Sequence, residues 1–109
     1  MNFDVRTLPN FEKEAKRLSK KHRSLKKDLL ILIESLEKSP RQGEPLGNDF
    51  YKVRLAISSK GSGKSGGARI ITCVKILKNI VFLSSIYDKS EKATITNQEL
   101  KLLARQIKL

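Results

Sequence analysis

The spacing of apolar residues between Asn10 and Leu36 constrains the fold most, because it repeats with the period of an α-helix in two separate stretches. The first stretch starts at Asn10, just after Pro9, and cations surround its apolar stripe. The second follows Ser24, which can cap a helix, and ends before Pro40. Its apolar stripe consists of Leu25, Leu29, Leu32, Ile33 and Leu36. Two amphipathic helices with a short polar joint predict an αα-hairpin.

After this hairpin the pattern changes to short runs rich in Val, Ile, Phe and Tyr, which favour strands. The change occurs across Pro40 to Asn48, a segment dense in turn-forming residues that we expect to contain no strand. The predicted strands are Phe50 to Ile57, Ala68 to Leu77 and Ile80 to Tyr87. Lys78 and Asn79 join the last two, and Asn tolerates positive φ, so an antiparallel hairpin is expected there.

The two ends of the sequence add one strand and one helix. Residues Asn2 to Leu8 alternate apolar and polar side chains, which predicts a short strand ended by Pro9. The tail from Thr96 to Leu109 has apolar residues at helical spacing, and Thr96 and Glu99 occupy capping-box positions. The resulting order, β-α-α-β-β-β-α, predicts an α+β fold whose antiparallel-rich sheet is packed by the N-terminal αα-hairpin. A length of 109 residues suits one domain, 1–109.

The charge balance points to a polyanionic partner. There are 23 Lys and Arg residues against 11 Asp and Glu residues, a formal net charge of +12. Nucleic acid is the first candidate partner, an acidic protein the second and a membrane surface the third. No stretch approaches the ~20 apolar residues of a spanning helix, and the start of the sequence lacks the apolar core of a signal peptide. We therefore expect a cytoplasmic protein with no membrane partner.

Five cations are predicted to converge at one edge of the sheet. Two share a face of the predicted strand from Phe50 to Ile57, two lie in the Gly- and Ser-rich connection from Ser58 to Gly67, and one opens the next strand. They are Lys52, Arg54, Lys60, Lys64 and Arg69. This clustering favours a phosphate site. The alternative, a flexible loop with solubilising charges, explains less well why cations recur on one strand face and along one loop.

Several other kinds of site are disfavoured by the residues present. The loop ends in Gly-Lys-Ser as a Walker A motif does, but Ser58 stands where that motif needs Gly, and the loop leads into a β-branched run, so an NTPase is not expected. His22 is the only imidazole, which rules out a Ser/His/Asp set, and Cys73 lies in an apolar run and is expected to pack. Acidic residues near the loop are few and scattered, so we expect no metal and no cofactor. Phosphoryl chemistry without a metal remains, with an RNA 2′-OH as nucleophile and Lys or Arg stabilising the phosphorane.

Three segments of the sequence, together with the element order, resemble the RelE/ParE superfamily of type II toxins. They are "PLGNDFYKVRLA", "GSGKSGGARII" and "IYDKSE". The likeness covers nearly the whole chain, and the stretch that includes Lys64 is most similar to the RelE/HigB branch. The resemblance implies an endonuclease that cuts mRNA on the ribosome and is silenced by a cognate antitoxin.

The resemblance also implies roles for individual residues. Lys52 and Arg54 would lie near the scissile phosphate, for proton transfer or charge neutralisation, and Arg69 would stabilise the phosphorane. Lys89 fits the cation that the family places after its last strand. Family nucleases commonly carry a Tyr or His near the C-terminus, and the C-terminal helix here has neither. Tyr87 is the nearest aromatic residue, and a structural role at the sheet edge would suit it equally.

Under the nuclease hypothesis, further cations bind RNA. They are Lys60 and Lys64 in the loop and Lys20, Lys21 and Arg23 on the helical hairpin, which would contact ribosomal RNA. The antitoxin would dock through an acidic segment, along the basic helices or on an exposed strand edge. Two alternatives stay open at this point: an inhibitor of DNA gyrase like the ParE branch, and a nucleic-acid-binding module without toxicity.

Overall fold

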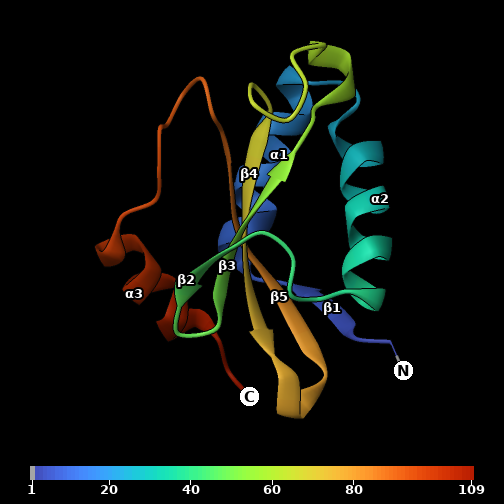
Figure 1. Ribbon diagram of the computed structural model, residues 1–109. Coiled ribbons are helices and arrows are strands. Elements are labelled where there is room, and N and C mark those ends of the chain that lie inside the picture. The colour runs from blue at the N-terminus through green and yellow to red at the C-terminus, as the bar shows by residue number, and fades with distance from the viewer. Residues whose placement is uncertain (1) are drawn as a thin grey trace.

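A computed structural model describes residues 2–109 as three helices and a five-stranded sheet (Figure 1). The elements are β1 (Asp4–Thr7), α1 (Pro9–Lys21), α2 (Leu25–Lys38), β2 (Glu44–Gly47), β3 (Phe50–Leu55), β4 (Ala68–Lys75), β5 (Ile80–Asp88) and α3 (Asn97–Gln106). The strand order is β1-β5-β4-β3-β2, and only the pairing of β1 with β5 is parallel. The predicted α+β class with an antiparallel-rich sheet is confirmed.

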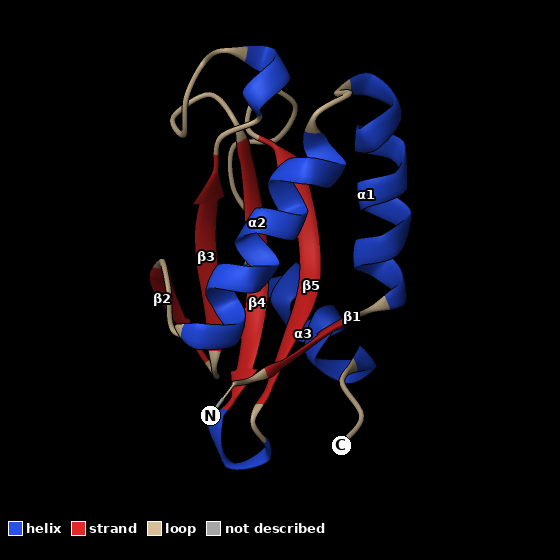
Figure 2. Cartoon of the chain, turned by 90° about the vertical axis from the view of Figure 1, so that its right-hand side faces the viewer, coloured by secondary structure: helices blue, strands red, loops and turns tan. Residues whose placement is uncertain are grey.

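Helices cover both faces of the sheet, and each face has its own apolar core. Helices α1 and α2 pack on one face, and α3 lies on the other (Figures 1 and 2). The first core joins Leu18 of α1 and Leu32 of α2 to Ile70 of β4. The second joins Leu103 of α3 to Phe82 of β5. Because β4 and β5 are buried on both faces, they form the rigid centre of the molecule.

The helical hairpin follows the predicted apolar stripes. Pro9 occupies the first turn of α1, where a missing N–H costs nothing, so the residue predicted to end the strand also begins the helix. Ser24 stands at the N-cap of α2, but its hydroxyl makes no capping bond. It donates to the carboxylate of Asp28 instead, at 2.8 Å, and accepts from the backbone N–H of Ser59. The predicted N-cap position of Ser24 is thus correct, but its hydroxyl connects α2 to the loop at Ser59 instead of capping the helix.

The predicted element order was wrong in one place, because β2 lies within the segment predicted to contain only turns. Pro45 pairs with Tyr51, and the register shifts before Gly47, which pairs with Phe50. A proline is tolerated there because β2 is an edge strand and needs hydrogen bonds on one side only. The turn-forming residues of this segment therefore led to a prediction without β2, which is a short, irregular edge strand.

The hairpin between β4 and β5 is confirmed, but its connection is longer than predicted. Strand β4 ends at Lys75, and Ile76–Lys78 form a single 3-10 turn that leaves Leu77 98% exposed. Asn79 has φ of +55°, the positive value expected of it. Because Lys75 pairs with Ile80, residues 76–79 form the connection between the two strands.

The C-terminal helix begins at the predicted capping box. The Thr96 hydroxyl accepts from the backbone N–H of Glu99, and the Glu99 carboxylate accepts from the backbone N–H of Thr96. Leu103 anchors the helix in the second core. Among residues 2–109, no helix has both the length and the apolar character needed to cross a membrane.

Candidate nucleic-acid interface

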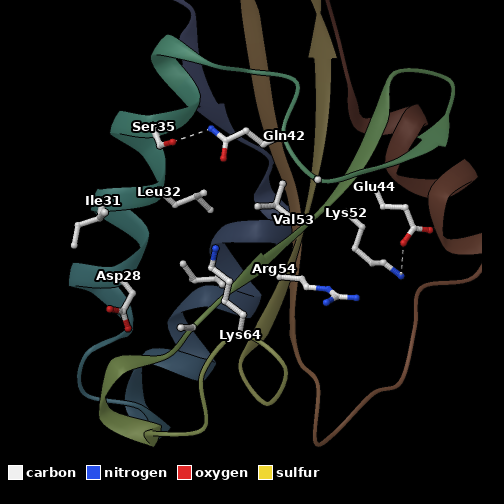
Figure 3. A pocket seen from close by; sticks show the side chains of 13 residues that line it. Asp28, Ile31, Leu32, Ser35, Gln42, Glu44, Lys52, Val53, Arg54 and Lys64 are labelled. Atoms are coloured by element: carbon white, nitrogen blue, oxygen red, sulfur yellow. Dashed lines mark hydrogen bonds and ion pairs between the residues drawn. The ribbon is translucent and has the colours of Figure 1, made fainter.

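Three of the predicted site residues lie in one row across β3, β4 and β5, at the ends of these strands nearest the glycine-rich loop. The register pairs Arg54 of β3 with Arg69 of β4, and Arg69 with Tyr87 of β5. Residues opposite one another on neighbouring strands carry their side chains on the same face. Lys52 lies two residues before Arg54 and points to the same side of β3, away from Val53 (Figure 3). The fold thus gathers four of the five predicted catalytic residues on the face that α3 covers.

Arg69 is turned toward the glycine-rich loop, residues 56–67, and is only 5% exposed. Its guanidinium donates to the carbonyl oxygens of Lys64 at 2.9 Å, Ala68 at 3.2 Å and Ser65 at 3.3 Å. These bonds fix the returning half of the loop against β4 and leave some guanidinium donors unused. The resemblance predicted that Arg69 stabilises the phosphorane directly. In the structure its guanidinium is bonded to loop carbonyl oxygens, and its positive charge lies buried under the loop.

The cations that solvent can reach surround the same end of β3. Arg54, Lys64 and Lys89 are exposed, while Lys52 is half-buried. The Lys52 ammonium lies 3.7 Å from the carboxylate of Glu44, a largely exposed partner across the β2–β3 ladder. Because Glu44 is 62% exposed and water screens its charge, the pair is worth little, so Lys52 can exchange Glu44 for a stronger anion. Lys64 reaches from the loop into a groove beside β3 (Figure 3).

Lys89 is tied to the end of the loop through its backbone. Its N–H donates to the carbonyl oxygen of Gly67 at 3.0 Å, while its ammonium reaches only the carbonyl oxygen of Ala93, at 3.4 Å. Gly67 has no room for a side chain, because a Cβ there would lie 2.1 Å from the carbonyl oxygen of Leu55. This close approach joins the two ends of the loop and brings the exposed Lys89 beside them.

Tyr87 is buried, with 4% of its surface exposed. Residues 89–96 and α3 cover it, and the ammonium of Lys92 lies 5.3 Å from its ring centroid. Its hydroxyl lies near Thr94 but makes no hydrogen bond of good geometry among residues 2–109, and burial raises the pKa of the phenol above its ordinary value. The hydroxyl therefore keeps its proton, and in this arrangement it does not reach solvent.

Lys60 faces inward, in contrast to the predicted contact with RNA. Its ammonium lies 2.9 Å from a carboxylate oxygen of Asp88, which is fully buried at the end of β5. Asp88 also accepts from Nε2 of His22 at 2.9 Å and from the hydroxyl of Ser90 at 2.7 Å. Burial opposes ionisation of this carboxyl, but the hydrogen bonds from Lys60 and Ser90 hold its pKa well below the usual range. Lys60 thus anchors the first turn of the loop to β5.

Asp28 is a second anchor of the loop, and sequence reasoning missed it. The carboxylate accepts from the backbone N–H of Ser58 at 2.9 Å, from the Ser58 hydroxyl at 2.6 Å and from the Ser24 hydroxyl at 2.8 Å. Although burial acts against it, these bonds lower the pKa of Asp28. No local pattern marks this residue, because its main partner lies 30 positions later in the chain.

The cations predicted on the helical hairpin are not equivalent. Lys20 and Arg23 are exposed at the end of α1 and in the joint that follows it. Lys21 instead pairs with Glu91 at 2.8 Å, and Arg17 donates to the same carboxylate at 2.9 Å. These hydrogen bonds lower the pKa of Glu91 to about 2. They hold residues 89–96 against α1, so Lys21 serves an internal contact as well as the basic surface.

The remaining nucleophilic or titratable side chains that the sequence analysis considered are buried and make internal contacts. Cys73 is buried in the second core, and burial raises the pKa of its thiol to about 11. His22, buried against Asp88, links α1 to β5. Within residues 2–109, no group of three His, Cys, Asp or Glu side chains is arranged to hold a metal ion. The interface is thus built from cations beside a loop that buried contacts hold in place.

Comparison with known proteins gives one family match. The family described as "RelE toxin of RelE / RelB toxin-antitoxin system" matches residues 10–108. A search of curated protein sequences finds no significant match.

Solved toxin structures share the fold. A mutant of the E. coli toxin RelE in the free state is 21% identical, with a TM-score of 0.65, over 99% of this chain and 100% of that one. The isolated E. coli RelE toxin is 24% identical, with a TM-score of 0.56, over 96% and 99%. A chain of the intact E. coli RelBE toxin–antitoxin complex is 27% identical, with a TM-score of 0.54, over 79% and 95%. The similarity in each case extends over most of both chains.

Proposed function

Because the chain belongs to the RelE toxin family, and so is a type II toxin, we propose that it cleaves messenger RNA on the ribosome. The observation that carries this proposal is the row of Arg54 and Arg69 beside Lys52, at the mouth of a loop whose two ends are fixed. An inhibitor that binds only a protein surface would not need cations concentrated at these positions. Action on translating ribosomes also implies a cytoplasmic location.

The first task of such a site is to hold a phosphate. Arg54 and Lys52 present their charges on the same face of β3, where Arg54 is open to solvent, and the exposed Lys64 lies on the other side of that strand (Figure 3). Arg54 can bind two phosphate oxygens at once, whereas the ammonium groups act as point charges. Arg69 supports them from below, since its charge lies in the buried layer next to Arg54. A buried charge is screened less by salt than an exposed one, which strengthens the field at the loop.

The second task is to stabilise charge as the phosphorus–oxygen bond breaks. In the proposed reaction the RNA 2′-hydroxyl loses its proton to water as its oxygen attacks the adjacent phosphorus, and the 5′-oxygen leaves and takes a proton from water. The products end in a 2′,3′-cyclic phosphate and a 5′-hydroxyl. Negative charge grows on the non-bridging oxygens, where Arg54 and Lys52 are placed to neutralise it. The ribosome would supply the orientation of the message, which accounts for much of the rate in reactions of this type.

Tyr87 and Lys89 are the predicted site residues on β5 and directly after it. Lys89 is exposed, and its ammonium has only a 3.4 Å contact with the carbonyl oxygen of Ala93, so we assign it the contact with the phosphate beyond the cleaved bond. Tyr87 is covered by residues 89–96, so its proposed contribution is to support the row next to Arg69. A direct contact between its hydroxyl and RNA would require those residues to move.

A toxin of this kind needs a neutralising partner, and we propose a cognate antitoxin. The similar E. coli toxin forms a complex with its own antitoxin, RelBE. The net charge of +12 here favours an antitoxin with an acidic binding segment.

The test is cleavage of a message in a translating extract by the purified full chain and by Arg54→Gln. We expect the variant to cut about 10²-fold to 10³-fold more slowly, which is typical when one group that stabilises transition-state charge is removed. Lys78→Gln is the matched control, since Lys78 is an exposed cation in the turn at the opposite end of the sheet (Figure 1). It should cut at the parental rate.

Two results would overturn the proposal. One is intact messages in the presence of the parent chain, with continued translation and DNA damage in cells, which points to gyrase. The other is an equal loss of activity in Arg54→Gln and Lys78→Gln, which would mean that only net charge matters.

A further inference from the structure

Two cations of α1 hold one carboxylate between them. Arg17 and Lys21 are four residues apart, so they share a face of the helix. The guanidinium of Arg17 donates to one carboxylate oxygen of Glu91 at 2.9 Å, and the ammonium of Lys21 donates to the other at 2.8 Å. Two cations that each bind one oxygen of the same anion form a site whose geometry also suits a phosphate.

Solvent reaches all three side chains of this cluster. Arg17 is 60% exposed, Lys21 50% and Glu91 33%. An exposed ion pair is worth little, because water solvates both partners when they separate. Arg17 and Lys21 can therefore exchange the carboxylate for another anion at low cost, and a phosphate offers the guanidinium two acceptor oxygens at once.

The backbone that carries Glu91 is fixed independently of these ion pairs. The N–H groups of Glu91 and Lys92 both donate to the carbonyl oxygen of Asp88 at 3.0 Å, and the N–H of Ser90 donates to the Asp88 carboxylate at 2.9 Å. The turn after β5 thus keeps its shape when the Glu91 side chain leaves α1. Exchange of the anion requires rotation of one exposed side chain, which is rapid, and no movement of the fold.

The surroundings of the pair are positive. Lys20 and Arg23 are exposed, and neither forms an ion pair among residues 2–109. The other acid near Lys21, at 3.9 Å, is Asp88, which is fully buried and already bonded to Lys60. Helix α1 ends at the same end of the sheet as the glycine-rich loop (Figure 2). The pair therefore extends the basic surface at the end of the molecule that carries the candidate interface.

Given the proposed action on RNA, on which this step rests, we propose that Arg17 and Lys21 form a second phosphate site for the RNA backbone, which Glu91 occupies in the free protein. When RNA binds, one of its phosphates takes the place of the Glu91 carboxylate, and the freed side chain turns to solvent. Glu91 is thus a built-in competitor of RNA. Because RNA binds only the fraction of molecules in which the pair is free, removal of Glu91 raises the apparent affinity for RNA.

The probe is a fluorescein-labelled single-stranded RNA with 2′-O-methyl groups, which lacks the 2′-hydroxyl nucleophile and stays intact. Its binding to the full chain is followed by fluorescence anisotropy. We expect Glu91→Gln to bind this RNA about fivefold more tightly than the parent, the gain expected when an exposed ion pair no longer competes. Glu34→Gln is the matched control, because it removes the same charge from an exposed acid of α2 that forms no ion pair among residues 2–109. It should bind within about twofold of the parent.

A double-mutant cycle separates competition from net charge. Arg17→Gln removes one of the two cations and should weaken RNA binding in the parent and in Glu91→Gln. The loss should be about twofold larger in Glu91→Gln, where Arg17 is no longer occupied by a carboxylate. Both side chains lie on the surface, so the fold should tolerate each change. Equal losses in the two backgrounds would overturn the competition between Glu91 and RNA.

The results distinguish this proposal from the nuclease proposal. Equal RNA affinity of Glu91→Gln and Glu34→Gln would overturn the second phosphate site even if messages are cut. If Glu91→Gln binds a glutamate-rich peptide more tightly and RNA no more tightly than the parent, the pair belongs to an acidic protein partner, and the RNA site is again overturned. A gain in RNA affinity confined to Glu91→Gln, in a chain that cuts no message, would support the site and refute the nuclease function.

Discussion

Replacing Asp88 with asparagine is expected to lower the free energy of unfolding by about 3 kcal/mol. The carboxylate is fully buried, and its Oδ1 accepts from Lys60 at 2.9 Å and from the N–H and hydroxyl of Ser90 at 2.9 and 2.7 Å. Asparagine keeps an acceptor there but leaves Lys60, whose side chain is 24% exposed, without a counter-charge. Breaking a buried pair costs about 3–5 kcal/mol, and partial solvation of Lys60 with retention of the acceptor places this case at the lower end.

The pH dependence gives this prediction a second, independent signature. The pKa of Asp88 is lower in the folded chain than its ordinary value, so its contribution is complete at neutral pH. That contribution is lost as the pH falls below about 4 toward the folded pKa. The parent chain therefore loses more stability in acid than Asp88→Asn, and the difference between them shrinks.

Urea unfolding of both proteins at neutral pH and near pH ~3 measures the two effects together. The control is Asp4→Asn, which removes a carboxylate paired with Arg6 on the surface, where both side chains are more than half exposed. An exposed pair of this kind should contribute little. If Asp88→Asn and Asp4→Asn unfold at the same urea concentration, the loop is not anchored by a buried ion pair.

Three further predictions concern other parts of the chain. Gly67→Ala should destabilise the fold by about 2 kcal/mol, since its Cβ would lie 2.1 Å from the Leu55 carbonyl oxygen; an unchanged melting temperature would contradict this. Thr96→Ala should cost about 1 kcal/mol by removing the capping bond to Glu99, measurable by urea unfolding and absent in Thr96→Ser. Cys73, with a thiol pKa of about 11, should react with iodoacetamide far more slowly in the folded chain than in urea, and equal rates would show that the thiol is accessible.

Part of the fold could be read from local patterns because the forces involved act within a few residues. The capping box at Thr96 depends on a contact three positions away, and the positive φ of Asn79 reflects a preference of that residue itself. The alternation that places Lys52 and Arg54 on one face of β3 is likewise a property of any strand. The short strand β2 escaped prediction because its pairing with β3 outweighed local turn preferences.

The sequence by itself therefore determined the fold class, the basic character of the chain and the cations near one loop. Only the tertiary structure decided which of these cations are free to meet a phosphate. Lys60 is paired with Asp88, 28 residues away, and Arg69 is bonded to loop carbonyls, while Arg54 and Lys64 remain exposed. Charge is a property of composition, but its availability depends on burial and on partners brought together from distant segments, which no local pattern encodes.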